Sequence, residues 1–285
     1  MLGLLALAAI VTVFVTVGIV YVLLSEGWTG FFSQESIIDF LTGTTWQPVS
    51  DKFGVLPLLG ASLMIAAIAA VVAIPVGVGS AIYLSEYAHP TFRSIAKPVL
   101  ELLAGMPTVV LGFFAIEAVK PALVNIGALP EGVAFSMLPA GIVVGLLIVP
   151  LIASISEDSL RAVPDAMRQG SYGLGATKSI TAAKVVVPAA LSGIMASIVL
   201  AISRAVGETM VVTLAAGARP NLTLNPVEEG QTITAVIVQI SQGEATRGSV
   251  QYGSIFAIGI VLFLVTLLIN IIAMQIVRRY RTVYE

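Results

Sequence analysis

Two opposite charges, Arg204 and Glu208, stand within an otherwise apolar stretch, residues 189–216. As one helix this stretch would be about 42 Å long, with Arg204 roughly 24 Å from its start. A spacing of four residues would place both side chains on one face of that helix. Because an arginine at the centre of a bilayer costs roughly 3 kcal/mol on insertion scales, we expect the pair to serve a purpose. We interpret it as part of a path for an anion.

The residue types indicate which anion chemistry such a path would favour. A guanidinium group presents a planar fork of donors that suits a tetrahedral oxyanion. Glu208 would occupy Arg204 when no anion is present and so weaken net binding, and the hydroxyl of Thr209 would add a further contact. The alternative is a structural ion pair that holds this helix to a neighbouring one.

The composition indicates an all-α integral membrane protein. Of the 285 residues, 58% are hydrophobic and only 11% are charged, whereas soluble domains carry about 25% charged residues. The chain contains no cysteine, which excludes disulfides, thiolate catalysis and thiolate-ligated metal. Its one histidine, His89, makes no metal site alone, so we expect neither a metal nor a catalytic residue in this chain.

Apolar runs predict six membrane-spanning helices. They are expected at residues 2–24, 55–84, 99–119, 137–155, 189–216 and 252–277. The first has no basic region before it and no convincing cleavage site, so we interpret it as a retained helix rather than a signal peptide. We divide the chain into an N-terminal helix with an outer loop (1–54), a transmembrane domain (55–277) and a tail (278–285).

Basic residues predict the orientation of these spans. One set of loops holds nine Lys and Arg residues and the other set holds four. Because cytoplasmic loops carry the excess of Lys and Arg, the first set and both termini are expected in the cytoplasm. The outer loops are acidic, which suits delivery of an anion by a partner protein better than its arrival from free solution.

No nucleotide-binding site is visible in the sequence. Residues 170–177 have the glycine spacing of a phosphate-binding loop, but Ala176 stands where the lysine is required. If transport is driven by ATP, the ATPase is therefore a separate chain. The lack of a convincing internal repeat argues mildly against a secondary transporter built from inverted repeats.

The segment 157–188 carries a more specific signal. It reads Gln169-Gly170-Ser171-Tyr172-Gly173-Leu174-Gly175, then nine residues, then Val185-Val186-Val187-Pro188. This segment resembles the EAA loop of ABC importer permeases, in which a cytoplasmic helix docks in a cleft of the ATPase subunit. Gln169-Gly170-Ser171 stands in place of Glu-Ala-Ala, and Val187-Pro188 in place of Leu-Pro.

Further motifs resemble the PstC family of phosphate ABC transporter permeases. They are Phe40–Pro48, Ile82–Tyr87, Glu101–Val110 and, most specifically, Arg204–Met210. The resemblance implies the type I ABC importer permease fold in a bacterial or archaeal plasma membrane. It also implies a PstA-like second permease, two ATPase subunits that carry ATP and Mg, and a periplasmic or lipid-anchored phosphate-binding protein.

The alternatives to phosphate transport are a permease for sulfate, molybdate or phosphonate and a scaffold that signals phosphate status. A secondary transporter is disfavoured, because the EAA-like segment would then have no use.

Overall fold

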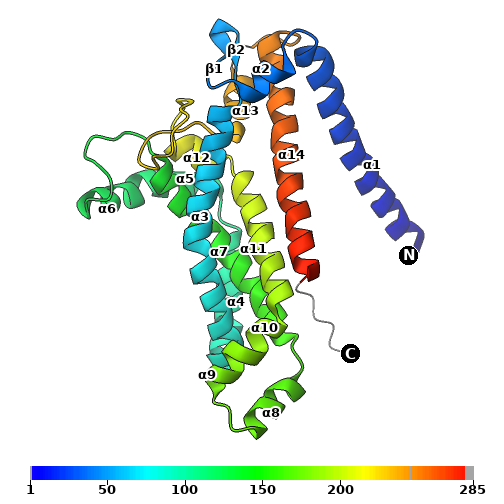
Figure 1. Ribbon diagram of the computed structural model, residues 1–285, viewed down its shortest axis with the longest axis vertical. Helices are drawn as coiled ribbons and strands as arrows, with labels where there is room; N and C mark the ends of the chain where they lie inside the picture. Colours follow the sequence, from blue (N-terminus) through cyan, green and yellow to red (C-terminus); the bar gives the residue numbers. More distant parts are fainter. Residues whose placement is uncertain (1, 244, 280–285) are drawn as a thin grey trace.

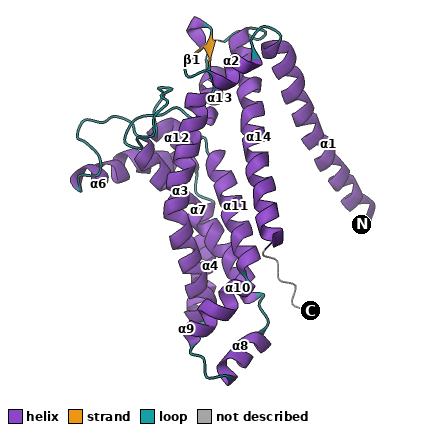
Figure 2. Ribbon diagram, viewed as in Figure 1, coloured by secondary structure: helices purple, strands orange, loops and turns teal. Residues whose placement is uncertain are grey.

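Long helices dominate the computed structural model, which describes residues 2–243 and 245–279 (Figures 1 and 2). The elements in chain order are α1 (Leu2–Gly27), η1 (Trp28–Phe32), α2 (Ile37–Thr42), β1 (Trp46–Gln47), η2 (Pro48–Ser50), β2 (Lys52–Phe53), α3 (Leu56–Ile82), η3 (Tyr83–Tyr87), α4 (Pro90–Ala104), α5 (Thr108–Phe114), η4 (Ala115–Val119), α6 (Lys120–Asn125), α7 (Met137–Arg161), α8 (Asp165–Gly173), α9 (Lys178–Thr181), η5 (Ala182–Val186), α10 (Val187–Ala189), α11 (Leu191–Val206), α12 (Met210–Ala215), α13 (Ile233–Gln242) and α14 (Val250–Arg279). The predicted tail, 278–285, lies largely outside the described residues.

Six segments account for the predicted spans. Within the described residues, five helices are long and apolar enough to cross a membrane: 3–32, 56–87, 108–125, 137–161 and 250–275. The sixth is a pair of helices, 178–189 and 191–206, bent by 68° between them. The six-helix prediction is therefore confirmed when the bent pair counts as one span.

The centre of the molecule is the pair α3 and α7, which lie side by side (Figure 1). A Cβ atom added at Gly141 would come within 2.7 Å of Ile68, and one added at Gly145 within 2.9 Å of Val72. These glycines let the two helices approach closely, as small residues do in membrane proteins. The core continues onto α11, whose Ser197 bonds Ser156 of α7 at 2.8 Å.

One end of the molecule, called here the hairpin end, carries most of the irregular structure. The antiparallel strands β1 and β2 pair Trp46 with Phe53, and the Phe31, Phe40 and Phe53 rings pack edge to face beneath them. At the opposite end, called the α8 end, lies the helix α8, and α1 begins and α14 ends toward that side (Figure 1). Helix α1 stands apart from the bundle along most of its length and meets α14 near the hairpin end.

The predicted third span, 99–119, is wrong in its boundaries. Helix α4 ends at Ala104, and a new helix starts at Thr108 and runs to Asn125. Proline lacks the N–H group that a helix interior needs and disfavours helical backbone in the residue before it, so Pro107 ends one helix and begins the next. Helix α4 instead packs on α7 as a separate amphipathic helix near the α8 end.

The predicted continuous helix 189–216 is also wrong. Helix α11 ends at Val206, Gly207 to Thr209 are not helical, and α12 begins at Met210. The chain therefore holds two helix breaks, called here break A (Gly105–Pro107) and break B (Gly207–Thr209).

The close approach of α3 and α7 predicts the effect of adding one methyl group. Gly141→Ala should lower the free energy of unfolding by about 1–3 kcal/mol, because the new Cβ overlaps Ile68. The matched control is Gly79→Ala on α3, where nothing lies within 4 Å of the added Cβ and stability should hold or rise. Thermal unfolding of the purified protein in detergent measures both, and equal behaviour of the two variants would contradict this packing.

Candidate translocation and coupling sites

Break B is held by Glu208, whose side chain is 8% exposed. Its Oε1 accepts hydrogen bonds from the backbone N–H of Met210 at 3.2 Å and of Val211 at 3.4 Å, the first two residues of α12. Its own carbonyl oxygen accepts a hydrogen bond from the hydroxyl of Thr234 at 2.7 Å. A carboxylate at a helix N-terminus satisfies free N–H groups and interacts favourably with the helix dipole. Glu208, the residue before the N-cap position Thr209, therefore caps the first turn of α12 with its side chain.

Arg204, in the last turn of α11, connects break B to break A. Its Nη2 donates to the carbonyl oxygen of Ala104, the last residue of α4, at 3.3 Å. Across the described residues this is the one hydrogen bond found for the guanidinium group, which has five N–H donors in all. The side chain is half-buried, so it lies at the surface of this single chain.

The expected pairing of Arg204 with Glu208 does not occur. No ion pair joins these side chains within the described ranges, 2–243 and 245–279. The prediction that Arg204 and Glu208 lie on one face required a continuous helix. Helix α11 instead ends at Val206, with Gly207 as its C-cap, so the helix stops between these two residues. Thr209 lies in the break itself, where its hydroxyl donates to the carbonyl of Gly207 at 3.3 Å.

Both breaks lie within the span of the long helices. The N–H of Ser136, just before α7, donates to the carbonyl of Ala215 at the end of α12. Helix α12 has six residues and therefore a rise of about 9 Å. The distance from the hairpin end of α7 to break B is at most about this length. Beyond the breaks α12 packs on α5, where a Cβ added at Gly112 would meet Leu214 at 2.6 Å.

The surface at the breaks is open in this chain. Gly105, Met106, Pro107 and Gly207 are all exposed. Non-helical backbone at membrane depth is tolerated only where other protein buries it or where it lines a water-filled cavity. The exposed breaks therefore face either another subunit or an aqueous path.

The EAA-like segment forms a helix, a turn and a second helical stretch at the α8 end (Figure 1). Helix α8 contains Gln169 to Gly173, and Gly175 turns the chain with a φ of +81°, a conformation that favours glycine. The hydroxyls of Ser171 and Thr181 bond at 2.8 Å and hold the two arms together. Pro188 lies in α10, directly after η5 and near the end of the helical stretch 178–189. Tyr172 and Leu174 are exposed, at 41% and 91%.

Arg168 attaches α8 to the membrane helices. Its Nη2 pairs with Oε1 of Glu86, in η3 at the end of α3, at 3.0 Å and bonds the carbonyl of Leu160 at 2.9 Å. Its Nη1 bonds the carbonyl of Val163 at 2.6 Å. The side chains of Arg168 and Glu86 are 15% and 4% exposed, so the pair is largely shielded from water.

A second buried carboxylate, Glu157 of α7, attaches α4 to the same region. Lys97 of α4 bonds Glu157 Oε2 at 2.9 Å and also pairs with Asp158. Arg93 lies 3.8 Å from Glu157 Oε1 and donates to the carbonyls of Leu84 and Ser85 in η3. Burial alone would lower the pKa of Lys97, but its hydrogen bonds to Asp158 and Glu157 outweigh burial and raise it.

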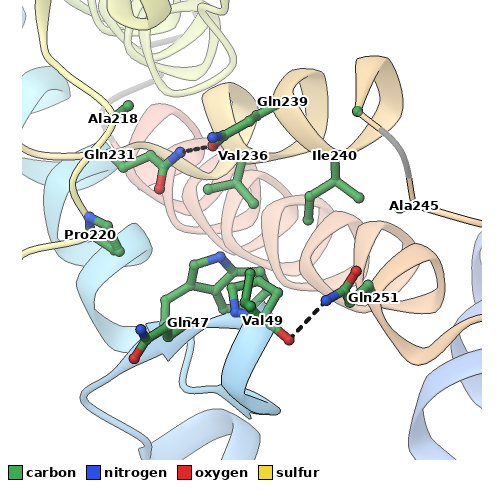
Figure 3. A pocket seen from close by; sticks show the side chains of 13 residues that line it. Gln47, Val49, Ala218, Pro220, Gln231, Val236, Gln239, Ile240, Ala245 and Gln251 are labelled. Atoms are coloured by element: carbon green, nitrogen blue, oxygen red, sulfur yellow. Dashed lines mark hydrogen bonds between the residues drawn. The ribbon is translucent and has the colours of Figure 1, made fainter.

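The hairpin end also has a cavity of about 320 Å³, ringed by amide and apolar side chains (Figure 3). Gln231 and Gln239 bond each other on one side of it, and Gln251 donates to the carbonyl of Pro48 (Figure 3). Sequence reasoning missed this cavity and the contacts of Glu86, Lys97 and Glu157. The one available signal was an acidic residue, Glu157, at the end of an apolar run.

Over the described residues, no group of three or more His, Asp or Glu side chains could hold a metal ion.

Comparison with known proteins defines the class. Residues 73–282 match the family described as binding-protein-dependent transport system inner membrane component, and the chain belongs to this family. It is 36% identical over 235 residues to the probable ABC transporter permease protein YqgH of Bacillus subtilis, covering 82% of this chain and 75% of that protein. It is 32% identical over 255 residues to the phosphate transport system permease protein PstC of Haemophilus influenzae, covering 82% and 79%.

Solved structures share the fold. A bacterial ABC transporter involved in the import of alginate superposes with a TM-score of 0.64 at 14% identity, covering 95% of each chain. The MetNI methionine ABC transporter superposes with a TM-score of 0.58 at 18% identity, covering 83% of this chain and 99% of that one. The predicted ABC importer permease fold is confirmed.

The capping geometry predicts how Glu208 variants behave. Glu208→Ala should lower stability by about 0.5–2 kcal/mol, because α12 loses its cap. Glu208→Gln keeps an acceptor oxygen and should retain most of that stability. Thermal unfolding of both variants measures the difference, and a Gln variant as unstable as the Ala variant would show that the hydrogen bonds to α12 are not what Glu208 provides.

Proposed function

We propose that this chain is the permease subunit of an ATP-driven phosphate importer and forms half of its translocation path. The observation that carries the proposal is the meeting of two exposed helix breaks at Arg204, a cation in the last turn of α11, which forms part of a candidate membrane span. The relatives named PstC support phosphate as the solute. ATP hydrolysis belongs to a partner chain, since the family is that of a transport system's membrane component.

Arg204 offers the chemistry that phosphate needs. In this conformation the guanidinium is bound to a neutral carbonyl, that of Ala104, and not to a carboxylate. A hydrogen bond between ionised groups is stronger than one to a neutral group, so an oxyanion is the preferred partner of Arg204 once the carbonyl has withdrawn. Thr209 supplies a hydroxyl at break B, and Glu208 stabilises the first turn of α12 by accepting a hydrogen bond from its backbone. Release follows when the carbonyl returns to Arg204.

The path needs a second permease to enclose it. Met106, Val110 and Phe113, beside break A, are exposed apolar side chains at membrane depth. A PstA-like subunit that covers them would bury this surface and close the far wall of the path. Two ATPase subunits, with ATP and Mg, would dock on α8 and its counterpart, and a phosphate-binding protein would deliver its ligand at the hairpin end.

This assignment of ends follows from charge. Eight of the nine Lys and Arg residues of the basic set are described, and they lie in the loops and helix ends of the α8 side. This excess supports a cytoplasmic position for the α8 end and for both termini, in a bacterial or archaeal cell. Closure of the ATPase dimer would then move α8 and open the path to the hairpin end. Hydrolysis would reset the inward-facing state.

The role of Arg204 is tested by substitution. Arg204→Gln should leave the complex assembled but lower phosphate uptake at least tenfold, because loss of a charge-assisted hydrogen bond of roughly 1.5–3 kcal/mol has that size. The charge-matched control is Arg247→Gln, an exposed residue between α13 and α14 that should transport normally. Uptake of labelled phosphate into proteoliposomes containing the whole complex and its binding protein is the measurement.

Two outcomes would contradict this role. An assembled Arg204→Gln complex with normal uptake would remove Arg204 from the path. Failure of Arg204→Gln to assemble, with Arg204→Lys both assembling and transporting normally, would make it a structural residue. Sulfate and molybdate as competitors in the same assay separate phosphate from the other oxyanions.

Docking of the ATPase is tested at Leu174. Leu174→Glu should lower co-purification of the ATPase subunit at least tenfold, because a charge would replace an apolar side chain in a packed interface. Leu224→Glu is the matched control, since Leu224 is equally exposed, at 90%, in the loop before α13. Equal co-purification of the ATPase with both variants would exclude the α8 turn as its docking site.

A further inference from the structure

The two ionic contacts at the α8 end form one continuous connection between α8 and Arg204. Arg168 fastens α8 to η3 through Glu86 and to the end of α7 through the carbonyls of Leu160 and Val163. On the same two elements, Arg93 and Lys97 fasten α4: Arg93 bonds the η3 carbonyls, and Lys97 bonds Glu157 of α7. Helices α8 and α4 are therefore attached to a common base, although about 70 residues separate Lys97 from Arg168.

The other end of α4 is break A. Seven residues, a rise of about 10 Å, separate Lys97 from Ala104, whose carbonyl receives Arg204. A helix of this length moves as a rigid body, so a shift at Lys97 displaces the carbonyl at Ala104. Among the described residues α8 makes no direct hydrogen bond or ion pair with α11. It reaches α11 indirectly, through the Ser156–Ser197 bond of α7 and through Thr181, but the route through α4 is the one that ends at the hydrogen-bond partner of Arg204.

We propose that Arg168 and Lys97 are positioning residues that transmit movement of α8 through α4 to Arg204. The inference rests on the proposed function in one respect, that an ATPase moves α8. Pulling α8 away from the membrane helices draws η3 and the end of α7 with it, carries α4 along, and withdraws the Ala104 carbonyl from the guanidinium. The anion site then becomes available when the ATPase closes.

Burial makes this connection stiff. Glu157 is 1% exposed and Glu86 is 4% exposed at their side chains, and breaking one partner of a buried pair leaves a charge without compensation. Glu157 Oε1 accepts no hydrogen bond from the residues that the structure describes and depends on the nearby charges of Arg93 and Arg161, each 3.8 Å away. Neither α4 nor α8 can therefore slide on this base without loss of favourable interaction.

The test measures movement of α4 directly. The chain has no cysteine, so spin labels can be attached at Leu102→Cys on α4 and Leu200→Cys on α11, both exposed sites, within a complex whose partner subunits lack cysteine. In the labelled parent complex, trapping with ATP and vanadate should change the distance between the labels. Arg168→Gln and Lys97→Gln should each abolish that change, while ATP hydrolysis by the assembled complex continues.

Transport supplies the second readout. Each variant should lower the phosphate moved per ATP hydrolysed by roughly fivefold or more, the lower range of measured couplings between sites. Because the contacts act in series, the double variant should be no worse than the more severe single variant, whereas independent structural defects would multiply. Arg247→Gln is the control, since this exposed residue between α13 and α14 lies outside the connection and should keep both the label movement and the ratio.

Two results would overturn the proposal: a label distance that still changes in Arg168→Gln, or effects that multiply in the double variant. If Arg168→Gln does not assemble, Arg168→Lys replaces it, because it keeps the charge beside Glu86 but cannot hold Glu86 and both carbonyls together. Failure of the phosphate assignment would look different, since the parent complex would move no phosphate while the label distances would still respond to ATP and vanadate.

Discussion

Backbone groups freed inside a membrane must find partners within the protein, and this requirement shapes the centre of the molecule. Breaks A and B release carbonyl and N–H groups where lipid offers no hydrogen bonds. Arg204 donates a hydrogen bond to the carbonyl of Ala104, and Thr234 donates one to the carbonyl of Glu208. The carboxylate of Glu208 accepts hydrogen bonds from the N–H groups of Met210 and Val211. The two charged residues of the apolar stretch thus satisfy backbone at the breaks, and the same contacts leave most of the guanidinium available to a ligand.

The helices beside the breaks are held to one another in two different ways. Helices α3 and α7 meet through glycines at a close, fixed distance, while α4 lies on α7 through charges. Tight apolar packing holds α3 and α7 together, and buried charges attach α4 and α8 to one base, η3 and the end of α7, so that these two helices move together. The fold therefore combines a fixed scaffold with an attached element whose far end is the partner of Arg204.

The sequence predicts the long helices well and the breaks poorly. Uninterrupted apolar runs identify α3, α7 and α14 because length and composition alone decide a span. Length and composition also predict α11 and α12 as one helix, because a glycine such as Gly207 does not interrupt an apolar run. Pro107 was visible inside the predicted third span, but hydropathy does not reveal that it separates two helices. Consequently the predicted pairing of Arg204 with Glu208 on one helix face is wrong, while the role of Arg204 in an anion path stays a prediction.

Distance along the sequence explains why the EAA-like segment could be recognised and why the ionic contacts at the α8 end could not. The EAA-like segment is recognisable because Gly175 must adopt a positive φ at a fixed position between two helical arms. The contacts of Arg168 with Glu86 and of Lys97 with Glu157 join residues 82 and 60 positions apart, and no periodicity in the sequence records them. Such pairs become visible only when the fold brings the elements together.

The central claim is that Arg204 changes partner, from the carbonyl of Ala104 to the transported anion. A cryo-electron microscopy structure of the whole complex, trapped with ATP and vanadate in the presence of phosphate, tests it most directly. The account predicts that Arg204 and the Ala104 carbonyl are no longer within hydrogen-bonding distance and that anion density contacts the guanidinium. An Arg204 that keeps its bond to Ala104 in the trapped state, with no anion beside it, would contradict the account.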